Sequence, residues 1–168
     1  MIRPLALALI LLAPPAFAET LTAEAATTLA TQESRDWCAA QGGTLDLGEA
    51  PATAVDLTGD GTADDWIISE AMAFCGPDYG YLGGSGGAML HAVIGTKVQS
   101  WLAGAWALED VGFTVEGETL PATRVLILGL HGSNCDSYGA APCMLALTWD
   151  GKRLIGYQPL PEEPAPAE

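Results

Sequence analysis

The first clear periodicity along the chain is helical and covers residues 20–41. The stretch has no glycine or proline, and apolar side chains recur at roughly helical spacing at Leu21, Ala25, Leu29 and Trp37. Thr20 or Thr22 can cap its start, and Gly42-Gly43 can end it because glycine accepts the left-handed conformation that stops helices. The pattern predicts one N-terminal helix.

After Gly43 the pattern changes to short apolar runs separated by Gly, Pro and Asp, which is typical of antiparallel strands. The predicted strands are 44–48, 53–57, 65–75, 88–95, 97–103, 105–111, 123–132, 144–150 and 152–158. Asp150-Gly151 suits a tight hairpin turn between the last two strands. The expected fold is mainly β (α+β), an antiparallel sheet in a sandwich or barrel-like arrangement with one N-terminal helix.

The two ends of the chain differ from this middle part. Residues 1–18 join a basic Arg3 to an apolar run and an Ala-x-Ala site, which predicts a secretory signal peptide. Its apolar run is too short to span a bilayer, and no cysteine follows the cleavage site to carry an acyl anchor. Residues 19–158 have the length of a single globular domain. The Pro- and Glu-rich residues 159–168 are expected to form a disordered tail.

Charge and export together narrow the class of partner. The formal net charge is −15, and such a surface repels nucleic acid and anionic lipid. The expected location is the periplasm or the medium, with no transmembrane anchor once the signal peptide is removed. Divalent cations and basic proteins are the favoured partners.

The four cysteines of an exported chain predict two disulfides, for which three pairings are possible. Cys135 and Cys143 enclose a short loop containing Gly and Pro, which favours a local bridge and leaves Cys38 to pair with Cys75. A zinc or redox site is the rival interpretation. It is disfavoured because the chain has no CxxC pair.

The stretch DLTGDGTADD, residues 56–65 and hereafter the aspartate loop, has the spacing of a calcium loop. Alternate residues can turn oxygens toward one cation, and Gly61 permits the sharp turn. Thr58 is a poorer ligand than Asp or Asn, and Ile67 stands where an EF-hand places its bidentate glutamate. The stretch is therefore not an EF-hand.

The loop resembles the calcium loops of FG-GAP and VCBS-type repeats of secreted bacterial proteins, in which a DxNxDGxxD segment continues into a strand. The resemblance covers only this segment of the chain. It implies a structural calcium ion bound by Asp56, Thr58, Asp60, Thr62 and Asp64, with Asp65 or Glu70 completing the shell. The alternative is an Asp-rich turn in which the carboxylates bond backbone amides and bind no metal.

A second motif is GGSGG at residues 83–87, which matches the GxSxG nucleophile elbow, with Asp110 and His131 following Ser85 in the order of hydrolases. The elbow requires a helix after the serine, whereas the residues downstream are typical of a strand. A bent glycine-rich loop is therefore the favoured interpretation of this segment.

The chain has two histidines. His91 lies in an apolar run and is expected to be a strand residue with a satisfied hydrogen-bond partner. His131 precedes the Cys135 to Cys143 segment, and polar residues on a disulfide-closed loop can form a recognition surface. The candidate surface is His131, Asn134, Asp136 and Tyr138; a hydrogen-bonded loop corner is the simpler alternative.

Large aromatic side chains allow two interpretations. Trp66, Trp101, Trp106, Trp149, Tyr79 and Tyr81 could form a sugar platform, but core packing in a small β domain is favoured. The sequence therefore predicts an exported bacterial protein of non-catalytic binding or structural function at the cell envelope, with a protein or glycan as its ligand. The alternative is a small envelope hydrolase that uses Ser85 and His131 or a calcium-assisted site.

Overall fold

The computed structural model describes residues 20–77, 80–112, 114–115, 118–119, 121–141 and 143–156. The predicted signal peptide, residues 1–18, and the predicted tail, residues 159–168, lie outside these ranges. Among the residues described, no helix is both long enough and apolar enough to cross a membrane.

The N-terminal helical region consists of two consecutive helices, α1 (Ala23–Ala30) and α2 (Gln32–Ala40). The prediction of one continuous helix was therefore wrong. The interruption is Thr31, whose hydroxyl donates a 2.8 Å hydrogen bond to the Thr27 carbonyl, an interaction that bends helices. Thr22 caps α1 with its side chain, as one of the two predicted caps.

Eleven of the described strands form three antiparallel sheets. The helix-side sheet has the order β2 (Ala52–Val55), β3 (Asp65–Ser69), β6 (Ala88–Ile94) and β7 (Lys97–Ala103). The outer sheet has the order β13 (Leu154–Gly156), β12 (Cys143–Trp149), β11 (Thr123–Leu130) and β8 (Ala105–Val111). The small sheet has the order β1 (Thr44–Asp46), β4 (Phe74–Gly76) and β5 (Gly80–Tyr81). A separate pair joins β9 (Thr114–Val115) to β10 (Glu118–Thr119).

The sequence pattern located the long strands better than the short ones. The predicted strands 97–103 and 105–111 coincide with β7 and β8. The predicted strand 65–75 was wrong in its continuity, because a turn follows Glu70 and the Ala73 amide bonds the Glu70 carbonyl at 2.9 Å. This turn separates β3 from β4 and leaves Glu70 at the end of a buried strand.

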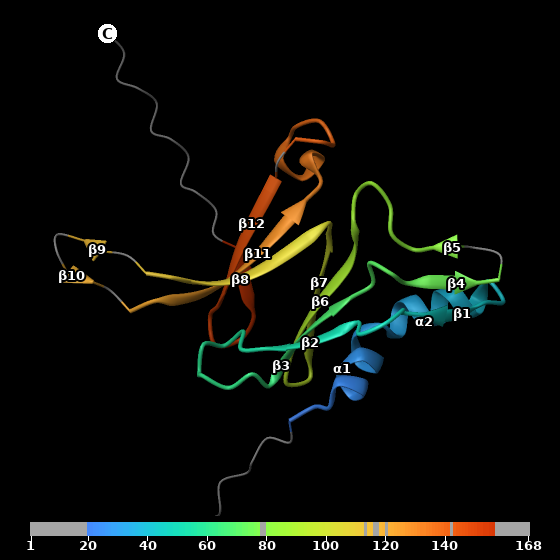
Figure 1. Ribbon diagram of the computed structural model, residues 1–168, viewed down its shortest axis with the longest axis horizontal. Coiled ribbons are helices and arrows are strands. Elements are labelled where there is room, and N and C mark those ends of the chain that lie inside the picture. The colour runs from blue at the N-terminus through green and yellow to red at the C-terminus, as the bar shows by residue number, and fades with distance from the viewer. Residues whose placement is uncertain are drawn as a thin grey trace, which may run out of the picture.

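The two large sheets pack face to face, and α1 covers the other face of the helix-side sheet, while α2 packs against β1 of the small sheet (Figure 1). Leu57, Ile67 and Leu90 meet Leu126 and Leu128 in the core between the sheets. A second cluster joins α1 to the opposite face of the helix-side sheet through Ala26, Ala30, Ile68 and Val93. The result is three layers, with one face of β3, β6 and β7 turned toward the helices.

Both favoured disulfides are present, Cys38–Cys75 and Cys135–Cys143. The first ties the last turns of α2 to β4 and lies in a small core with Leu45 and Leu47. Gly43 passes so close to this bridge that an added Cβ would lie 2.7 Å from the Cys75 sulfur. The bridge therefore fixes α2 against the small sheet.

Candidate functional site

The strongest candidate site is a pocket of about 410 Å³ between α2 and the helix-facing side of the helix-side sheet. We call it the helix–sheet pocket. Its polar and aromatic lining comes from Glu33, Ser34, Trp37, Glu70, His91 and Ser100. A volume of this size is in the range of small-molecule sites.

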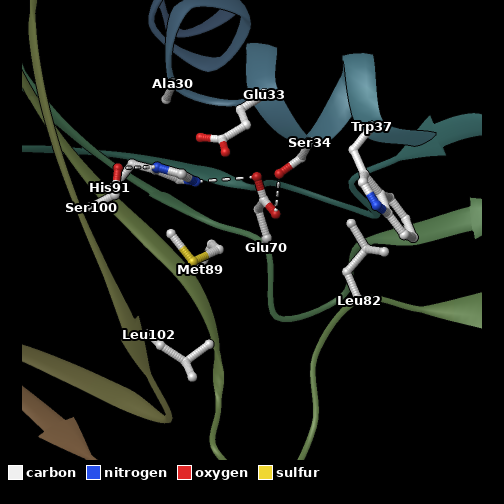
Figure 2. A pocket seen from close by; sticks show the side chains of 10 residues that line it. All are labelled: Ala30, Glu33, Ser34, Trp37, Glu70, Leu82, Met89, His91, Ser100 and Leu102. Carbon is white, nitrogen blue, oxygen red and sulfur yellow. Dashed lines mark hydrogen bonds and ion pairs between the residues drawn. The ribbon is translucent and has the colours of Figure 1, made fainter. Parts of the chain in front are cut away.

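A chain of hydrogen bonds runs along the floor of the pocket (Figure 2). The Ser34 hydroxyl donates to Oε2 of Glu70 at 2.9 Å. Oε1 of Glu70 lies 3.1 Å from Nε2 of His91, and Nδ1 of His91 lies 2.8 Å from the Ser100 hydroxyl. Helix α2, the residue that follows β3, and strands β6 and β7 thus supply a continuous series of hydroxyl, carboxylate, imidazole and hydroxyl groups.

Burial makes this series energetically important. The Glu70 and His91 side chains are 1% and 6% exposed. A buried carboxylate is tolerated only where donors replace its lost water. Here Ser34 and His91 supply those donors, while the direct cross-strand pairing of His91 with Ser100 holds the imidazole from its other side.

The chemistry available to the series depends on where the imidazole proton lies. With the proton on Nε2, His91 donates to Glu70 and its Nδ1 accepts the Ser100 hydroxyl. With both nitrogens protonated, His91 forms an ion pair with Glu70 and donates to Ser100. The series can therefore hold a ligand in a fixed orientation, or His91 can accept the Ser100 proton.

The remaining lining is apolar and forms the walls of the pocket. Leu82, Met89 and Leu102 contribute apolar surface, together with Ala30 from the end of α1. Figure 2 shows the Trp37 indole on the Leu82 side and the Glu33 carboxylate pointing from α2 toward the sheet. Trp37 and Leu102 are 45% and 48% exposed, so the apolar walls extend to the mouth of the pocket.

The sequence indicated only part of this site. His91 was expected to be a strand residue with a satisfied partner, and Glu70 and Ser100 are the partners found. Glu70 was considered only as an extra calcium ligand, whereas its two oxygens bond His91 and Ser34. The available signal was Glu70 itself, an acidic residue directly after the apolar segment DWIIS. The alternation of side chains along a strand places Glu70 on the same face as Ile68, the face turned toward the helices.

The aspartate loop is organised around Asp56, a buried residue. Oδ1 of Asp56 accepts the amides of Gly59 and Asp60 at 2.6 and 3.1 Å, and Oδ2 accepts the amide of Gly61 at 2.9 Å. The φ angle of Gly61 is 91°, a left-handed value that glycine adopts without strain. This is the hydrogen-bonding pattern of an Asp-rich turn.

The two buried carboxylates of the loop have opposite pKa shifts. Burial is the largest influence on Asp56 and raises its pKa, but three backbone amides and the Arg124 charge outweigh it, so the net pKa is lowered. Burial is also the largest influence on Asp65, and here it prevails over the Leu57 and Thr58 amides. The pKa of Asp65 is therefore raised.

Arg124 connects this loop to the outer sheet. Its guanidinium donates to the Asp56 carbonyl at 3.0 Å and forms a two-pronged pair with both oxygens of Asp110. Its Nη1 also lies 3.7 Å from Oδ2 of Asp56. Because Arg124 and Asp110 are cross-strand partners in β11 and β8, the loop is held against the outer sheet.

The predicted calcium ligands differ in how they are held. Asp56 is buried, Thr58 and Asp64 are half-buried, and Asp60 and Thr62 are exposed. Within the described ranges no three His, Cys, Asp or Glu side chains converge as a metal-holding group. The donor types still fit a hard cation, because calcium prefers carboxylate, hydroxyl and carbonyl oxygens. Calcium binding stays a prediction.

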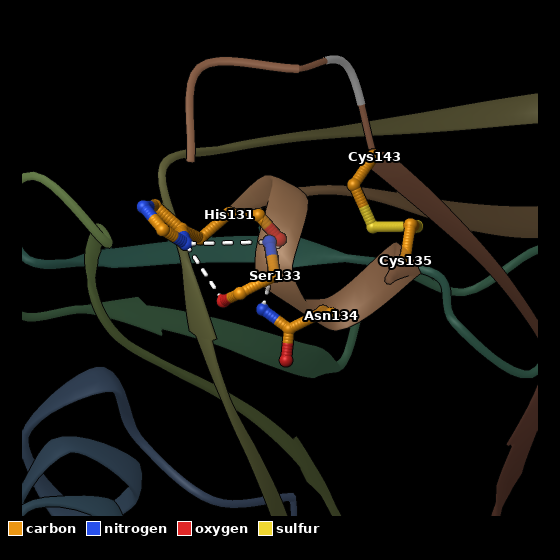
Figure 3. Close-up of a disulfide and its surroundings, with 5 residues drawn as sticks. All are labelled: His131, Ser133, Asn134, Cys135 and Cys143. Carbon is orange, nitrogen blue, oxygen red and sulfur yellow. Dashed lines mark hydrogen bonds between the residues drawn. A yellow bond between two sulfur atoms is a disulfide. The ribbon is translucent and has the colours of Figure 1, made fainter. Parts of the chain in front are cut away.

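The predicted recognition surface lies on the loop that the Cys135–Cys143 disulfide closes (Figure 3). His131 precedes the short 3-10 helix η1 (Gly132–Cys135), and its Nδ1 lies 2.8 Å from the Ser133 hydroxyl. The Asn134 side chain donates to the His131 carbonyl at 3.1 Å. Asn134, Asp136 and Tyr138 are exposed. The geometry is that of a hydrogen-bonded loop corner with an exposed polar rim.

The residues of the predicted serine elbow have separate partners. Ser85 lies in a turn closed by the bridge between Gly84 and Gly87, and strand β6 follows it where an elbow requires a helix. Asp110 is paired with Arg124 through both carboxylate oxygens. His131 bonds Ser133, so neither of the two expected triad partners of Ser85 bonds the other.

The tryptophans mainly serve packing. Trp101, Trp106 and Trp149 pack against the core between the sheets. The Trp66 indole packs against the α1 cluster and donates to the Leu21 carbonyl at 3.0 Å. Tyr79 lies outside the described residues. Core packing thus accounts for these four indoles, and Trp37 is the one beside the helix–sheet pocket.

Comparisons with protein-family models, with curated proteins and with solved structures found no match to this chain.

Proposed function

We propose that the chain is an exported, non-catalytic binding protein whose ligand occupies the helix–sheet pocket. The observation that carries this proposal is the buried Glu70–His91 pair on the floor of a pocket of about 410 Å³. A buried ionisable pair lining a cavity is a recurrent feature of functional sites. The predicted signal peptide and the two disulfides support an exported protein of the cell envelope.

The pocket is favoured over the His131 surface for a physical reason. A small ligand gains most from a concave site in which apolar walls surround a few polar groups. The pocket combines these elements, whereas the polar groups around His131 are directed to one another and to solvent. A protein or glycan bound at His131, Asn134, Asp136 and Tyr138 remains the alternative location within the same function class.

A screen for small-molecule binding tests this proposal. Saturation-transfer NMR on a mixed library would be run on the oxidised mature protein and on Leu102→Trp, which adds bulk at the mouth of the pocket. Met144→Trp, at a 76% exposed position of the outer sheet, is the matched control. We expect binders that are lost in Leu102→Trp and retained in Met144→Trp. Binders retained in both variants would place the site elsewhere.

A second candidate function is a serine hydrolase centred on Ser100 rather than Ser85. It is favoured by the 2.8 Å and 3.1 Å contacts that join Ser100 to His91 and His91 to Glu70. In this arrangement the Ser100 oxygen would attack an ester carbonyl while its proton passes to Nδ1 of His91. A hydrolase also requires donors aimed at the developing oxyanion, so binding is the better-supported function.

A fluorophosphonate probe separates the catalytic candidates. Labelling that disappears in Ser100→Ala would support the Ser100 series, and labelling that disappears in Ser85→Ala would support the GGSGG motif. An absence of labelling in the wild type would contradict both serine mechanisms.

We also propose that the aspartate loop binds calcium as a structural ion. The spacing of its oxygen-bearing residues and the net charge of −15 support this. At a hundredfold excess over the dissociation constant, calcium would stabilise the fold by about 2.7 kcal/mol, or roughly 5 to 10 °C in Tm for a chain of this size. After EDTA treatment, added calcium should raise the Tm of the wild type. It should also raise the Tm of the control variant Glu49→Gln, which loses a carboxylate outside the aspartate loop, but not that of Asp60→Ala. An unchanged wild-type Tm would contradict calcium binding.

A further inference from the structure

The helix–sheet pocket combines negative charge with apolar walls, and this combination selects a class of ligand. Two carboxylates, Glu33 and Glu70, line it, and among the residues that the structure describes no lysine or arginine does. Its one histidine already faces Glu70. Because the chain as a whole carries a net charge of −15, an anion would be repelled both locally and by the overall field.

The two carboxylates have different roles. Glu70 is 1% exposed, and its oxygens bond Ser34 and His91, so it sets the charge of the floor. Glu33 lies in the first turn of α2 and is exposed. Within the described part of the chain its carboxylate has no hydrogen bond or ion pair, so it can meet a charged group of a ligand without breaking an existing contact.

The walls exclude a simple metal ion as the best occupant and favour an organic one. Leu82, Met89 and Leu102 supply no oxygen ligands, whereas a hard cation requires several. Trp37 follows Glu33 by four residues on α2 and lines the same pocket, and tryptophan is the aromatic side chain that attracts ammonium groups best. The apolar surface would pack against the body of the ligand.

We propose that the helix–sheet pocket binds a small organic cation, an amine with an apolar body, with its ammonium group near Glu33 and Trp37. This inference rests on the proposed binding function and adds the ligand class. Its distinguishing consequence is charge selectivity among ligands of the same shape. Neutral and anionic analogues should bind more weakly than the amine.

Isothermal titration calorimetry with three matched probes tests the selectivity: 2-phenylethylamine, 2-phenylethanol and phenylacetate. We expect the amine to bind with the highest affinity and phenylacetate to give no measurable heat. Glu33→Gln should weaken amine binding about threefold, the size of effect typical of one exposed charge pair, with an unchanged Tm. Glu109→Gln, an equal charge change on an exposed residue of β8, should leave the affinity unchanged.

The outcomes separate this inference from the proposed function. If the alcohol binds as tightly as the amine and both are lost in Leu102→Trp, the pocket is a binding site but the cation inference is wrong. If amine binding persists in Leu102→Trp, both the inference and the proposed location are wrong. Equal weakening of amine binding by Glu33→Gln and Glu109→Gln would reduce the effect to general electrostatics and overturn the assignment to Glu33.

Discussion

Removal of the Glu70 carboxylate should destabilise the protein far more than removal of its neighbour Glu33. Glu70 is 1% exposed and accepts hydrogen bonds from two side chains, so Glu70→Ala leaves His91 and Ser34 without their acceptor and opens a cavity. Breaking a buried pair in this way costs about 3 to 5 kcal/mol. For a domain of this size that corresponds to a decrease in Tm of roughly 6 to 20 °C.

Two further variants separate charge from shape. Glu70→Gln retains the shape and one acceptor oxygen, so we expect it to cost about 1 to 3 kcal/mol, the penalty for one unsatisfied buried group. Glu33→Gln changes an exposed side chain of the same pocket and should cost less than about 0.5 kcal/mol. The assay is urea denaturation of the oxidised mature protein followed by tryptophan fluorescence.

A double-mutant cycle with His91→Ala tests the coupling directly. We expect a coupling energy between Glu70 and His91 of about 1 to 3 kcal/mol, because neither side chain retains its partner in the single variants. If Glu70→Ala cost no more than Glu33→Gln, or if the two changes were additive, the described pairing on the floor of the pocket would be refuted.

Other predictions concern the disulfides and the aspartate loop. Loop-closure entropy over sequence separations of 37 and 8 residues predicts losses of about 3.8 and 2.5 kcal/mol when Cys38–Cys75 or Cys135–Cys143 is replaced by alanines; equal losses in urea denaturation would contradict this ranking. The pKa of Asp56 is lower in the folded state than in the unfolded state. Its carboxylate therefore adds to the free energy of unfolding above the unfolded pKa near 3.8, and this stabilisation is lost as pH falls through the lower folded pKa. We therefore expect Asp56→Asn to flatten the acid side of the stability–pH curve, and a curve parallel to that of the wild type would show that Asp56 does not contribute there.

The elements that could be predicted from the sequence are those with a strong local signal. The strands 97–103 and 105–111 were located because each is a short apolar run and Gly104 marks the break between them. The two strands do not form a hairpin, since β7 pairs with β6 and β8 pairs with β11 in the other large sheet. The favoured cysteine pairing was confirmed because the short Cys135 to Cys143 segment leaves little freedom. By contrast, the interruption at Thr31 coincides with a side-chain hydrogen bond to the Thr27 carbonyl, which a periodicity argument cannot detect.

The candidate site was harder to predict because it is assembled from distant segments. Ser34 and Glu70 are 36 residues apart in the chain, and Glu70 and His91 are 21 apart. No short motif encodes such an arrangement. The two motifs that do stand out locally, the aspartate loop and GGSGG, attracted the functional hypotheses, whereas the pocket depends on how the small sheet and the Cys38–Cys75 bridge place α2 beside the helix-side sheet.

The most direct test of the account is a map of where a small ligand binds. In ¹H–¹⁵N correlation spectra of the oxidised mature protein, titration with 2-phenylethylamine should shift the backbone signals of Ser34, His91 and Ser100 and the indole signal of Trp37. The signals of Asn134 in the Cys135 to Cys143 loop should stay unchanged. Shifts confined to that loop would contradict the assignment of the helix–sheet pocket as the binding site, and no shifts at millimolar ligand would contradict the organic-cation inference.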